Sequence, residues 1–234
     1  MTERGTEMYS KNTQNFLKTL FDIGAIKIDT EGGFRLALHD KNPSAPLSPI
    51  YVNLRTKDNP KPGPLLADHV VTIASEMERV AEKAGIHFDG VAGIPRAGVP
   101  FAKAFCDIRK KLQKPTRMIC LKKRGVSSRA MCVDAEHVIR EPSETRKRIL
   151  LVDDLITKAT TKWTAIDALR RGGYEAAGIV VYLDREQGGL LSLSQSGIPI
   201  VATLTFGKVL EFYRDVGLMS PKDFSIINRY LKST

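Results

Sequence analysis

From about Phe88 onward, the chain alternates between short apolar runs and longer amphipathic stretches. Short runs rich in β-branched residues are typical of buried strands, and apolar positions three and four residues apart are typical of helices. The pattern predicts strands at residues 88–93, 117–121, 148–152, 177–183 and 198–205, and helices at 99–112, 160–171 and near 188–195. Strands that alternate with helices favour an α/β fold with a doubly wound, mainly parallel sheet.

The first residues follow a different pattern, which predicts a small N-terminal cap region over residues 1–47. We expect a helix at residues 12–23 and a hairpin at 25–38 that turns at Glu31-Gly32-Gly33. A further amphipathic helix is expected at 65–84, after a proline-rich turn. The α/β core then covers residues 48–215, and a final helix within 216–234 packs on the cap.

Composition is that of an ordinary globular protein, with 234 residues of which 42% are hydrophobic and 26% charged. No apolar run reaches the roughly 20 residues of a membrane-spanning helix, and the first residues lack an apolar signal core. The scattered cysteines Cys106, Cys120 and Cys132 have neither disulfide nor zinc spacing, so we expect reduced thiols. These features predict a soluble, cytoplasmic protein with no membrane partner.

The formal net charge of +10 is compatible with two kinds of partner. A basic surface binds nucleic acid, or it attracts small polyanions such as phosphorylated metabolites. The basic clusters at residues 109–114, 122–124 and 146–148 have no interleaved aromatic residues, which a platform for single-stranded nucleic acid uses. Nucleic acid is therefore not expected, but charge alone leaves the choice open.

The stretch of residues 148–163 combines an apolar strand with the polar residues that follow it. Asp153 and Asp154 come at the predicted strand end, and the helix is then introduced by Thr157, Lys158, Ala159, Thr160 and Thr161. Ligands of open parallel sheets bind beyond the carboxyl ends of the strands. Amide groups at a helix start suit a phosphate, and solvated carboxylates suit ribose hydroxyls or a pyrophosphate-bound Mg²⁺. The structural alternative is that the acids cap a turn and Thr160 caps the helix.

This stretch resembles the binding segment for phosphoribosyl pyrophosphate (PRPP) of type I phosphoribosyltransferases. In that family the two acids contact the ribose hydroxyls and the loop holds the 5-phosphate. The resemblance implies these roles for Asp153 and Asp154 and for residues 157–161. The chain differs from the family at Ala159, where glycine is frequent, and a loop without glycine has less freedom to wrap a phosphate.

Residues 181–189, Val-Tyr-Leu-Asp-Arg-Glu-Gln-Gly-Gly, resemble the segment of orotate phosphoribosyltransferases that carries the arginine gripping the base. Arg185 stands at that position. Orotate carries a carboxylate, which a guanidinium binds through two parallel hydrogen bonds. The structural alternative is that Arg185 pairs with Asp184 or Glu186 on the surface.

Two further segments resemble the same family. Residues 89–100 are similar to its pyrophosphate loop, which implies that Arg96, Ala97 and the neighbouring amides face the leaving pyrophosphate. Residues 48–55 are similar to its N-terminal strand, which implies that Tyr51 stacks on the base. The structural alternatives are an ordinary strand-to-helix connection and core packing of Tyr51.

One segment departs from the family, whose flexible catalytic loop carries a basic pair and then a lysine and a histidine. Lys122-Lys123 matches the basic pair, but Val126 and Ser128 stand at the lysine and histidine positions. Lys123 is the first candidate for the loop cation and Arg129 the second. We expect residues 124–136 to form a long, mobile connection between two strands, and turnover to be slower than in the family unless an arginine compensates.

Together the resemblance implies an orotate phosphoribosyltransferase that forms orotidine 5′-phosphate and pyrophosphate from PRPP and orotate. It also implies dependence on Mg²⁺ carried by PRPP near Asp153 and Asp154, and a homodimer whose loop acts on the partner's site. The alternatives are a nucleic-acid-binding regulator with this fold and a phosphoribosyltransferase for another base.

Overall fold

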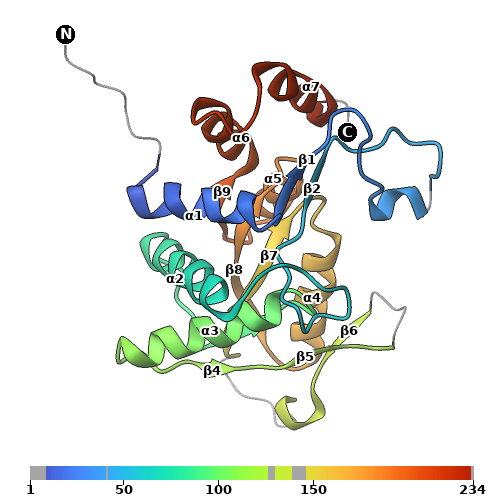
Figure 1. Ribbon diagram of the computed structural model, residues 1–234. Coiled ribbons are helices and arrows are strands. Elements are labelled where there is room, and N and C mark those ends of the chain that lie inside the picture. Colours follow the sequence, from blue (N-terminus) through green and yellow to red (C-terminus); the bar gives the residue numbers. More distant parts are fainter. Residues whose placement is uncertain (1–8, 41, 126–129, 139–145, 233–234) are drawn as a thin grey trace. The chain divides into compact units, whose positions relative to one another are not determined.

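The computed structural model describes residues 9–40, 42–125, 130–138 and 146–232 (Figure 1). Contacts divide the chain into two compact units. The larger unit is continuous, from Arg55 to Phe206, and the smaller one combines the residues up to Leu54 with those from Gly207 onward. The boundaries drawn from the sequence, after residues 47 and 215, therefore lie several residues from those of the contact-based units.

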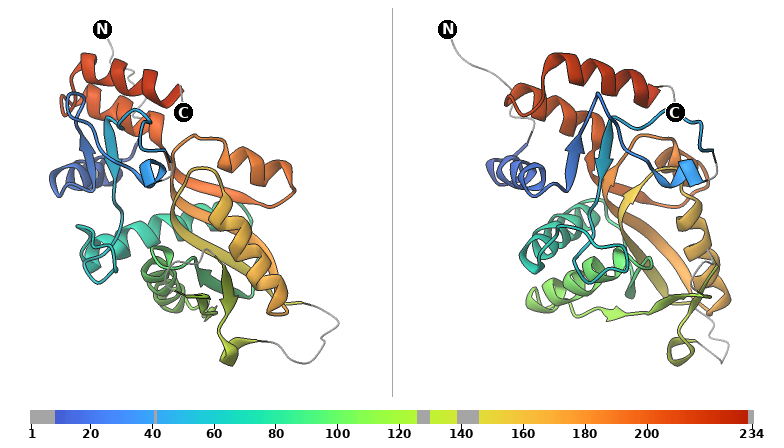
Figure 2. Two further views of the ribbon diagram at one scale, coloured as in Figure 1. Left: turned by 90° about the vertical axis from the view of Figure 1, so that its right-hand side faces the viewer. Right: turned by 45° about the vertical axis from the view of Figure 1, so that its right-hand side comes forward.

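Within the described residues, the larger unit has a five-stranded parallel sheet in the order β4-β3-β7-β8-β9. The strands are β3 (Gly90–Gly93), β4 (Arg117–Met118), β7 (Arg148–Ile156), β8 (Glu175–Asp184) and β9 (Ile200–Thr205). One face of the sheet is covered by α2 (Ala67–Lys83) and α3 (Gly98–Lys111), and the other by α4 (Thr160–Arg171) and α5 (Gly189–Gln195) (Figures 1 and 2). The predicted α/β, doubly wound parallel sheet is confirmed.

The central strands β7 and β8 are buried along almost their whole length. Strands covered by helices on both faces read as continuous apolar runs, as Ile-Leu-Leu-Val at residues 149–152 does. Leu151 and Val181 pack with Ile166 and Leu169 of α4 in one core cluster. Burial of such a side chain contributes about 1.5–3 kcal/mol, so this cluster anchors α4 and the loop in front of it.

The strand order contains a topological switch. The chain leaves β3 toward β4 in one direction, and it leaves β7 toward β8 and β9 in the other. Loops that leave neighbouring strands in opposite directions open a crevice between them, at the carboxyl ends of the strands. In this chain the crevice is expected between β3 and β7.

The segment that follows β4 differs from the prediction. The expected strand at residues 117–121 is split into β4 and β5 (Leu121–Lys123), and β5 forms an antiparallel pair with β6 (Met131–Val133). A short 3-10 helix, η2, follows at Ala135–His137. The expectation of an irregular connection over residues 124–136 is thus wrong for the part that forms β6 and η2. Residues 126–129 lie outside the described residues.

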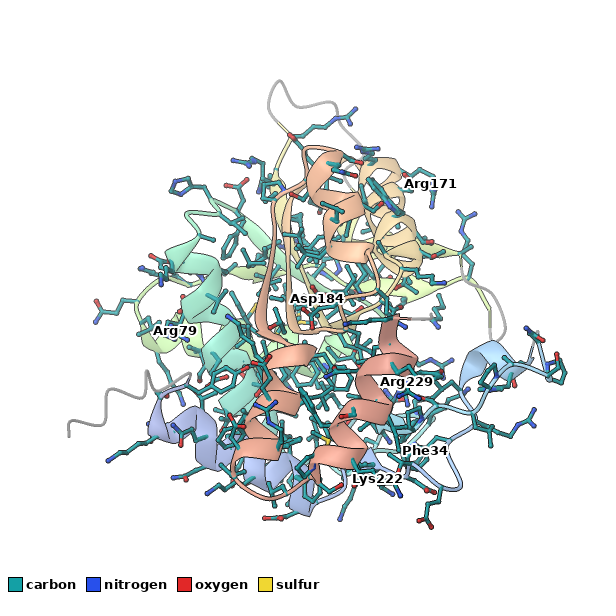
Figure 3. All side chains as sticks on the ribbon, turned by 90° about the horizontal axis from the view of Figure 1, so that it is seen from above. Phe34, Arg79, Arg171, Asp184, Lys222 and Arg229 are labelled. Carbon is teal, nitrogen blue, oxygen red and sulfur yellow. The ribbon has the colours of Figure 1, made fainter. Side chains whose placement is uncertain are left out.

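The smaller unit contains α1 (Lys11–Asp22), β1 (Ile26–Ile28), the 3-10 helix η1 (Ala37–Asp40), β2 (Ile50–Val52), most of α6 (Phe206–Asp215) and α7 (Pro221–Lys232). The predicted hairpin at residues 25–38 is wrong, because β1 pairs antiparallel with β2 instead. The helix α6 was not predicted from the sequence. Its Tyr213 hydroxyl donates a hydrogen bond to the Leu17 carbonyl, at 2.8 Å. Lys222 and Arg229 mark α7 in Figure 3.

In the part of the chain that the structure describes, no helix is both long and apolar enough to cross a membrane.

Candidate functional site

The loops that follow β3, β7 and β8 meet at the carboxyl edge of the sheet. The Ile94 amide donates to the Val152 carbonyl at 2.9 Å, which joins the first loop to β7. A methyl group on Gly98 would stand 2.2 Å from that carbonyl and 3.1 Å from Asp153 Oδ1, so only glycine lets this loop approach so closely. The structure thus brings residues 94–98 against the acid pair that the sequence analysis assigned to ribose binding.

The acid pair was expected to be solvated, but the structure buries both side chains. Asp153 and Asp154 lie inside β7, which continues to Ile156, and their exposed fractions are 5% and 8%. Asp153 Oδ1 accepts the Asp154 amide at 3.0 Å, and Asp154 Oδ1 accepts the Leu155 amide at 2.8 Å. The structural alternative, in which the acids only cap a turn, does not describe residues within a strand.

A lysine missed by the sequence analysis holds one of these acids. Lys162 of α4 donates from Nζ to Asp153 Oδ2 at 2.8 Å and also to the Leu155 carbonyl. The exposed fractions of the two side chains are 4% and 8%, so the ion pair is shielded from water. Removing one partner of such a pair costs about 3–5 kcal/mol, because the other charge is left buried alone. Sequence spacing does not reveal this pair, because it depends on the first turn of α4 facing β7 in the folded chain.

Asp154 is electrostatically unusual. Its pKa is raised to about 7, first by burial and then by the neighbouring charge of Asp153, whereas Lys162 acts in the opposite direction. A carboxyl group with this pKa is only partly ionised near neutral pH. A cation beside it would favour the charged form, so this position suits contact with a metal ion or with cationic character in a substrate.

The expected phosphate loop, residues 157–161, contains a left-handed residue at the start of α4. Ala159 has φ 54° and ψ −3°, precedes α4 as its N-cap residue and makes no side-chain capping bond. The alternative in which Thr160 caps the helix is therefore wrong, since Thr160 is the first helical residue. Lys158, Thr160 and Thr161 are exposed and Thr157 is half-buried. Amide groups at such a helix start attract anions, and the exposed hydroxyls add further donors.

The segment after β8 is bonded to the phosphate loop. The Arg185 amide donates to the Ile156 carbonyl at 3.0 Å, and the Gly189 amide donates to the Thr157 carbonyl at 2.8 Å. A methyl group on Gly189 would stand 2.3 Å from the Thr157 carbonyl oxygen, so this contact requires glycine. The Arg185 guanidinium lies 5.7 Å from the centre of the Phe206 ring. The expected phosphate and base segments thus form one connected edge.

Two other carboxylates frame the arginine in the sequence. Asp184 Oδ1 accepts the Glu186 amide at 2.9 Å, and burial raises the Asp184 pKa. Figure 3 marks Asp184 at the end of its strand. Asp184 therefore shapes the turn after β8 through the backbone.

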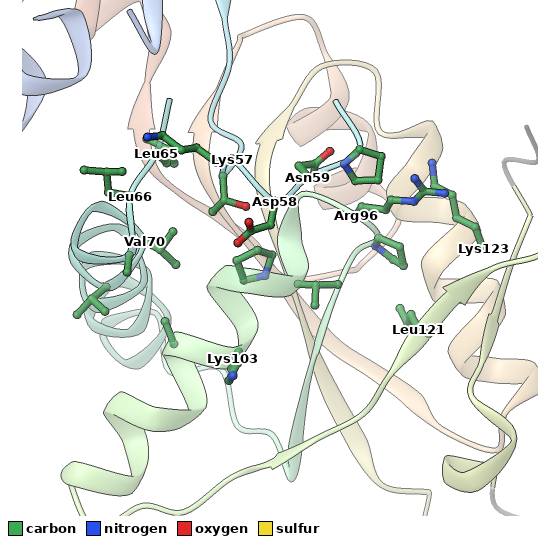
Figure 4. Close-up of a pocket in the computed structure, with 18 of the residues that line it drawn as sticks. Lys57, Asp58, Asn59, Leu65, Leu66, Val70, Arg96, Lys103, Leu121 and Lys123 are labelled. Carbon is green, nitrogen blue, oxygen red and sulfur yellow. The ribbon is translucent and has the colours of Figure 1, made fainter. Parts of the chain in front are cut away.

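A cavity of about 1020 Å³ adjoins the pyrophosphate loop. Its polar lining includes Arg96 and Lys123, which lie toward one side of the cavity in Figure 4, whereas Leu66 and Val70 lie toward the other. Ala97 is the N-cap residue of α3, and the Gly98 amide that follows it donates to the Ile94 carbonyl at 2.9 Å. Residues 153–161 and Arg185 do not line this cavity, so it extends away from the acid pair.

The remaining predicted site residues, Lys122, Tyr51 and Arg129, do not belong to the loops that meet at the carboxyl edge of the sheet. Lys122 also lines the cavity, but its ammonium pairs with Asp134 across the β5–β6 hairpin, which raises the lysine pKa and lowers that of the acid. Tyr51 lies on β2 in the smaller unit, its ring 5.8 Å from that of Phe34. Arg129 lies outside the described residues.

Comparison with known proteins identifies the family of the chain. Residues 58–196 match the model of the phosphoribosyl transferase domain. The chain is 31% identical to the orotate phosphoribosyltransferase of Sordaria macrospora, with 92% of this chain and 93% of the relative covered. It is 30% identical to the enzyme of that name from Pyrobaculum aerophilum, with 85% and 89% covered. This chain belongs to the orotate phosphoribosyltransferase family.

Solved structures of orotate phosphoribosyltransferases share the fold. The structure from Aeropyrum pernix superposes with a TM-score of 0.61 at 22% identity, covering 88% of this chain and 99% of that one. The structure from Francisella tularensis gives 0.64 at 19% identity, covering 94% and 98%. The family match covers residues 58–196 and so includes the acid pair, Arg185 and the two segments that were expected to bind phosphate and pyrophosphate.

Proposed function

We propose that this chain transfers the 5-phosphoribosyl group of PRPP to orotate, which yields orotidine 5′-phosphate and pyrophosphate. The observation that carries the proposal is a pair of backbone hydrogen bonds from the segment of Arg185, one to Ile156 at the end of β7 and one to Thr157 in the expected phosphate loop. These bonds bring the backbone of Arg185 next to the loop that precedes α4. A guanidinium suits the carboxylate of orotate and a helix start suits the phosphate of PRPP, which supports the proposal.

In this reaction the ring nitrogen of orotate forms a bond to C1 of the ribose and loses its proton. The bond from C1 to the pyrophosphate oxygen breaks, and its electrons leave with the pyrophosphate. The protein contributes mainly position and charge. Residues 157–161 hold the 5-phosphate, Asp153 and Asp154 face the ribose, and Arg96 with the amides near Ala97 receives the pyrophosphate. Lys123 adds a cation from the hairpin.

We further propose that PRPP enters with Mg²⁺. In the described residues no group of three or more histidine, cysteine, aspartate or glutamate side chains is suited to hold a metal, so an ion held by the protein alone does not fit. A substrate-carried ion does fit, because it needs few protein ligands and would favour the charged form of Asp154, whose pKa burial raises to about 7. When bound, the metal neutralises charge on the pyrophosphate.

A homodimer is the proposed assembly. Leu66, Val71 and Val99 line the cavity of the larger unit and are 51%, 46% and 36% exposed. Apolar side chains grouped at a cavity rim favour contact with another protein surface. A second copy of the chain is the proposed partner that covers these apolar side chains.

Ligand-induced thermal stabilisation tests the function against its alternatives. A ligand that binds only the folded state at 100 times its Kd stabilises it by about 2.7 kcal/mol. We expect stabilisation by PRPP with Mg²⁺, and by orotate together with pyrophosphate and Mg²⁺. We expect none from single-stranded or double-stranded nucleic acid at physiological salt. Stabilisation by nucleic acid alone would support the regulator instead.

A further inference from the structure

Lys162 is a buried lysine to which the proposed reaction assigns no task. Its side chain is 4% exposed, and its ammonium meets two oxygens, Asp153 Oδ2 and the Leu155 carbonyl. Lysine is seldom buried this deeply, because its charge loses hydration. A buried ammonium therefore has to be held by well-placed acceptors, and here both acceptors belong to the end of β7 that carries the acid pair.

The position of Lys162 in the chain adds a second argument. It lies in the first turn of α4, on the far side of the phosphate loop from Asp153 and Leu155. Its contacts therefore bridge the residues that enter the loop and the helix that leaves it. The loop has Ala159 rather than glycine at its left-handed position, and the N-cap residue makes no side-chain bond. The shape of the loop thus depends on bonds such as these.

The bridge also orients one carboxylate. Asp153 Oδ1 accepts a hydrogen bond from the Asp154 amide at 3.0 Å. The same oxygen is close to Gly98, since a methyl group on that glycine would stand 3.1 Å from it. With Lys162 on Oδ2, both oxygens of Asp153 are held by the chain. Asp153 is then at once the anchor of the phosphate loop and a neighbour of the pyrophosphate loop.

We propose that Lys162 is a positioning residue for PRPP, because it orients the Asp153 carboxylate and closes the phosphate loop through one ammonium group. The inference rests on the proposed function. Lys162 acts through Asp153 and Leu155 and does not touch substrate. Its loss should therefore weaken PRPP binding, and it should leave the orotate KM at saturating PRPP nearly unchanged.

The test compares Lys162→Met, which keeps the length of the side chain but not its charge, with Arg109→Met. Arg109 forms a comparably shielded ion pair with Glu78, at 3.0 Å, between α3 and α2. Calorimetry measures the Kd of PRPP with Mg²⁺, steady-state kinetics the orotate KM, and thermal unfolding the Tm. We expect Lys162→Met to raise the PRPP Kd at least about tenfold, which corresponds to 1.4 kcal/mol. Arg109→Met should lower the Tm with the PRPP Kd within about twofold of wild type.

Each result decides the inference. A folded Lys162→Met protein that binds PRPP like wild type would overturn it, and so would an equal loss of PRPP affinity in Arg109→Met. Should Lys162→Met not fold, Lys162→Gln, which keeps hydrogen-bond donors, carries the comparison with an expected rise of at least about threefold. Failure of the proposed function would show in the wild-type protein, which would then not bind PRPP. Failure of the inference alone would show only in the variants, with wild-type binding intact.

Discussion

At the scale of residues, burial changes the chemistry that sequence alone suggests for the acid pair. The order strand, acids, threonines and helix is visible in the sequence, and it located Asp153 and Asp154 correctly at this edge of the sheet. The extension of β7 to Ile156 was not visible, because Leu155 and Ile156 suit either a strand or a loop. The acids are therefore buried, and Asp154 is expected to weaken the folded state rather than to be neutral.

The pH dependence of stability follows from the direction of the Asp154 shift. Its pKa is raised from 3.8 to about 7, so between these values the folded state binds a proton that the unfolded state has released. The free energy of unfolding contributed by this group hence falls as pH rises through this window. Asp154→Asn lacks the effect, so its Tm relative to wild type should be higher at pH 8 than at pH 5, measured without ligand. Equal differences at both pH values would contradict the raised pKa.

Arg185 is expected to determine the choice of base. Arg185→Ala should weaken orotate binding by about 1.5–3 kcal/mol, because a charge-assisted pair is lost, and should leave PRPP binding largely intact. Calorimetry with each ligand measures the two effects. Arg170→Ala is the matched control, since Arg170 is 59% exposed and forms a surface contact with Asp167. Unchanged orotate affinity in Arg185→Ala would show that another group holds the base.

At the scale of elements, local pattern predicted the helices and strands of the core better than it predicted pairing. The helix at residues 160–171 has the predicted bounds, and Gly173 after it has φ 88°, as a helix-terminating glycine does. The hairpin at 25–38 failed because Glu31-Gly32-Gly33 signals a turn but does not specify which strand pairs with β1. Partners distant in the sequence, such as β2, are decided by packing that no local window contains.

The loop before α4 gives a prediction on backbone conformation. A left-handed alanine costs about 1–2 kcal/mol, and glycine removes this cost. Ala159→Gly also loses a buried methyl group, worth about 0.8 kcal/mol, and gains unfolded-state entropy, so these two losses nearly cancel the relief of strain. Ala159→Val adds a branched side chain in the same conformation and should lower the free energy of unfolding by at least about 2 kcal/mol. Chemical denaturation measures both, and a valine variant as stable as the glycine variant would contradict the strained loop.

At the scale of the whole molecule, the fold class followed from the alternation of strands and helices, and the family followed from four short segments in the right order. What sequence could not supply was the contact between them: the approach of Gly98 to Asp153, the bonds from Arg185 and Gly189 to the phosphate loop, and the Lys162 bridge. Each depends on side chains or amides that meet across different loops. The alternation of apolar residues carries no information about such meetings.

The proposed assembly makes a prediction at this scale. Replacing the exposed Leu66 and Val71 together by glutamate should convert a dimer into a monomer, because like charges would face each other across a two-fold contact. Analytical ultracentrifugation measures the mass. Leu112→Glu is the control, since Leu112 is 52% exposed at the end of α3 and does not line the cavity. A dimer that persists in the double variant would place the contact elsewhere.

The choice of orotate as the base is the central claim, and an assay of pyrophosphate release tests this choice directly. Purified protein is given PRPP, Mg²⁺ and one of orotate, uracil, adenine, guanine or hypoxanthine, and released pyrophosphate is quantified. We predict release with orotate that exceeds release with uracil by roughly 100-fold, because uracil leaves the Arg185 guanidinium without its carboxylate. Release with a purine or with uracil but not with orotate would contradict the account.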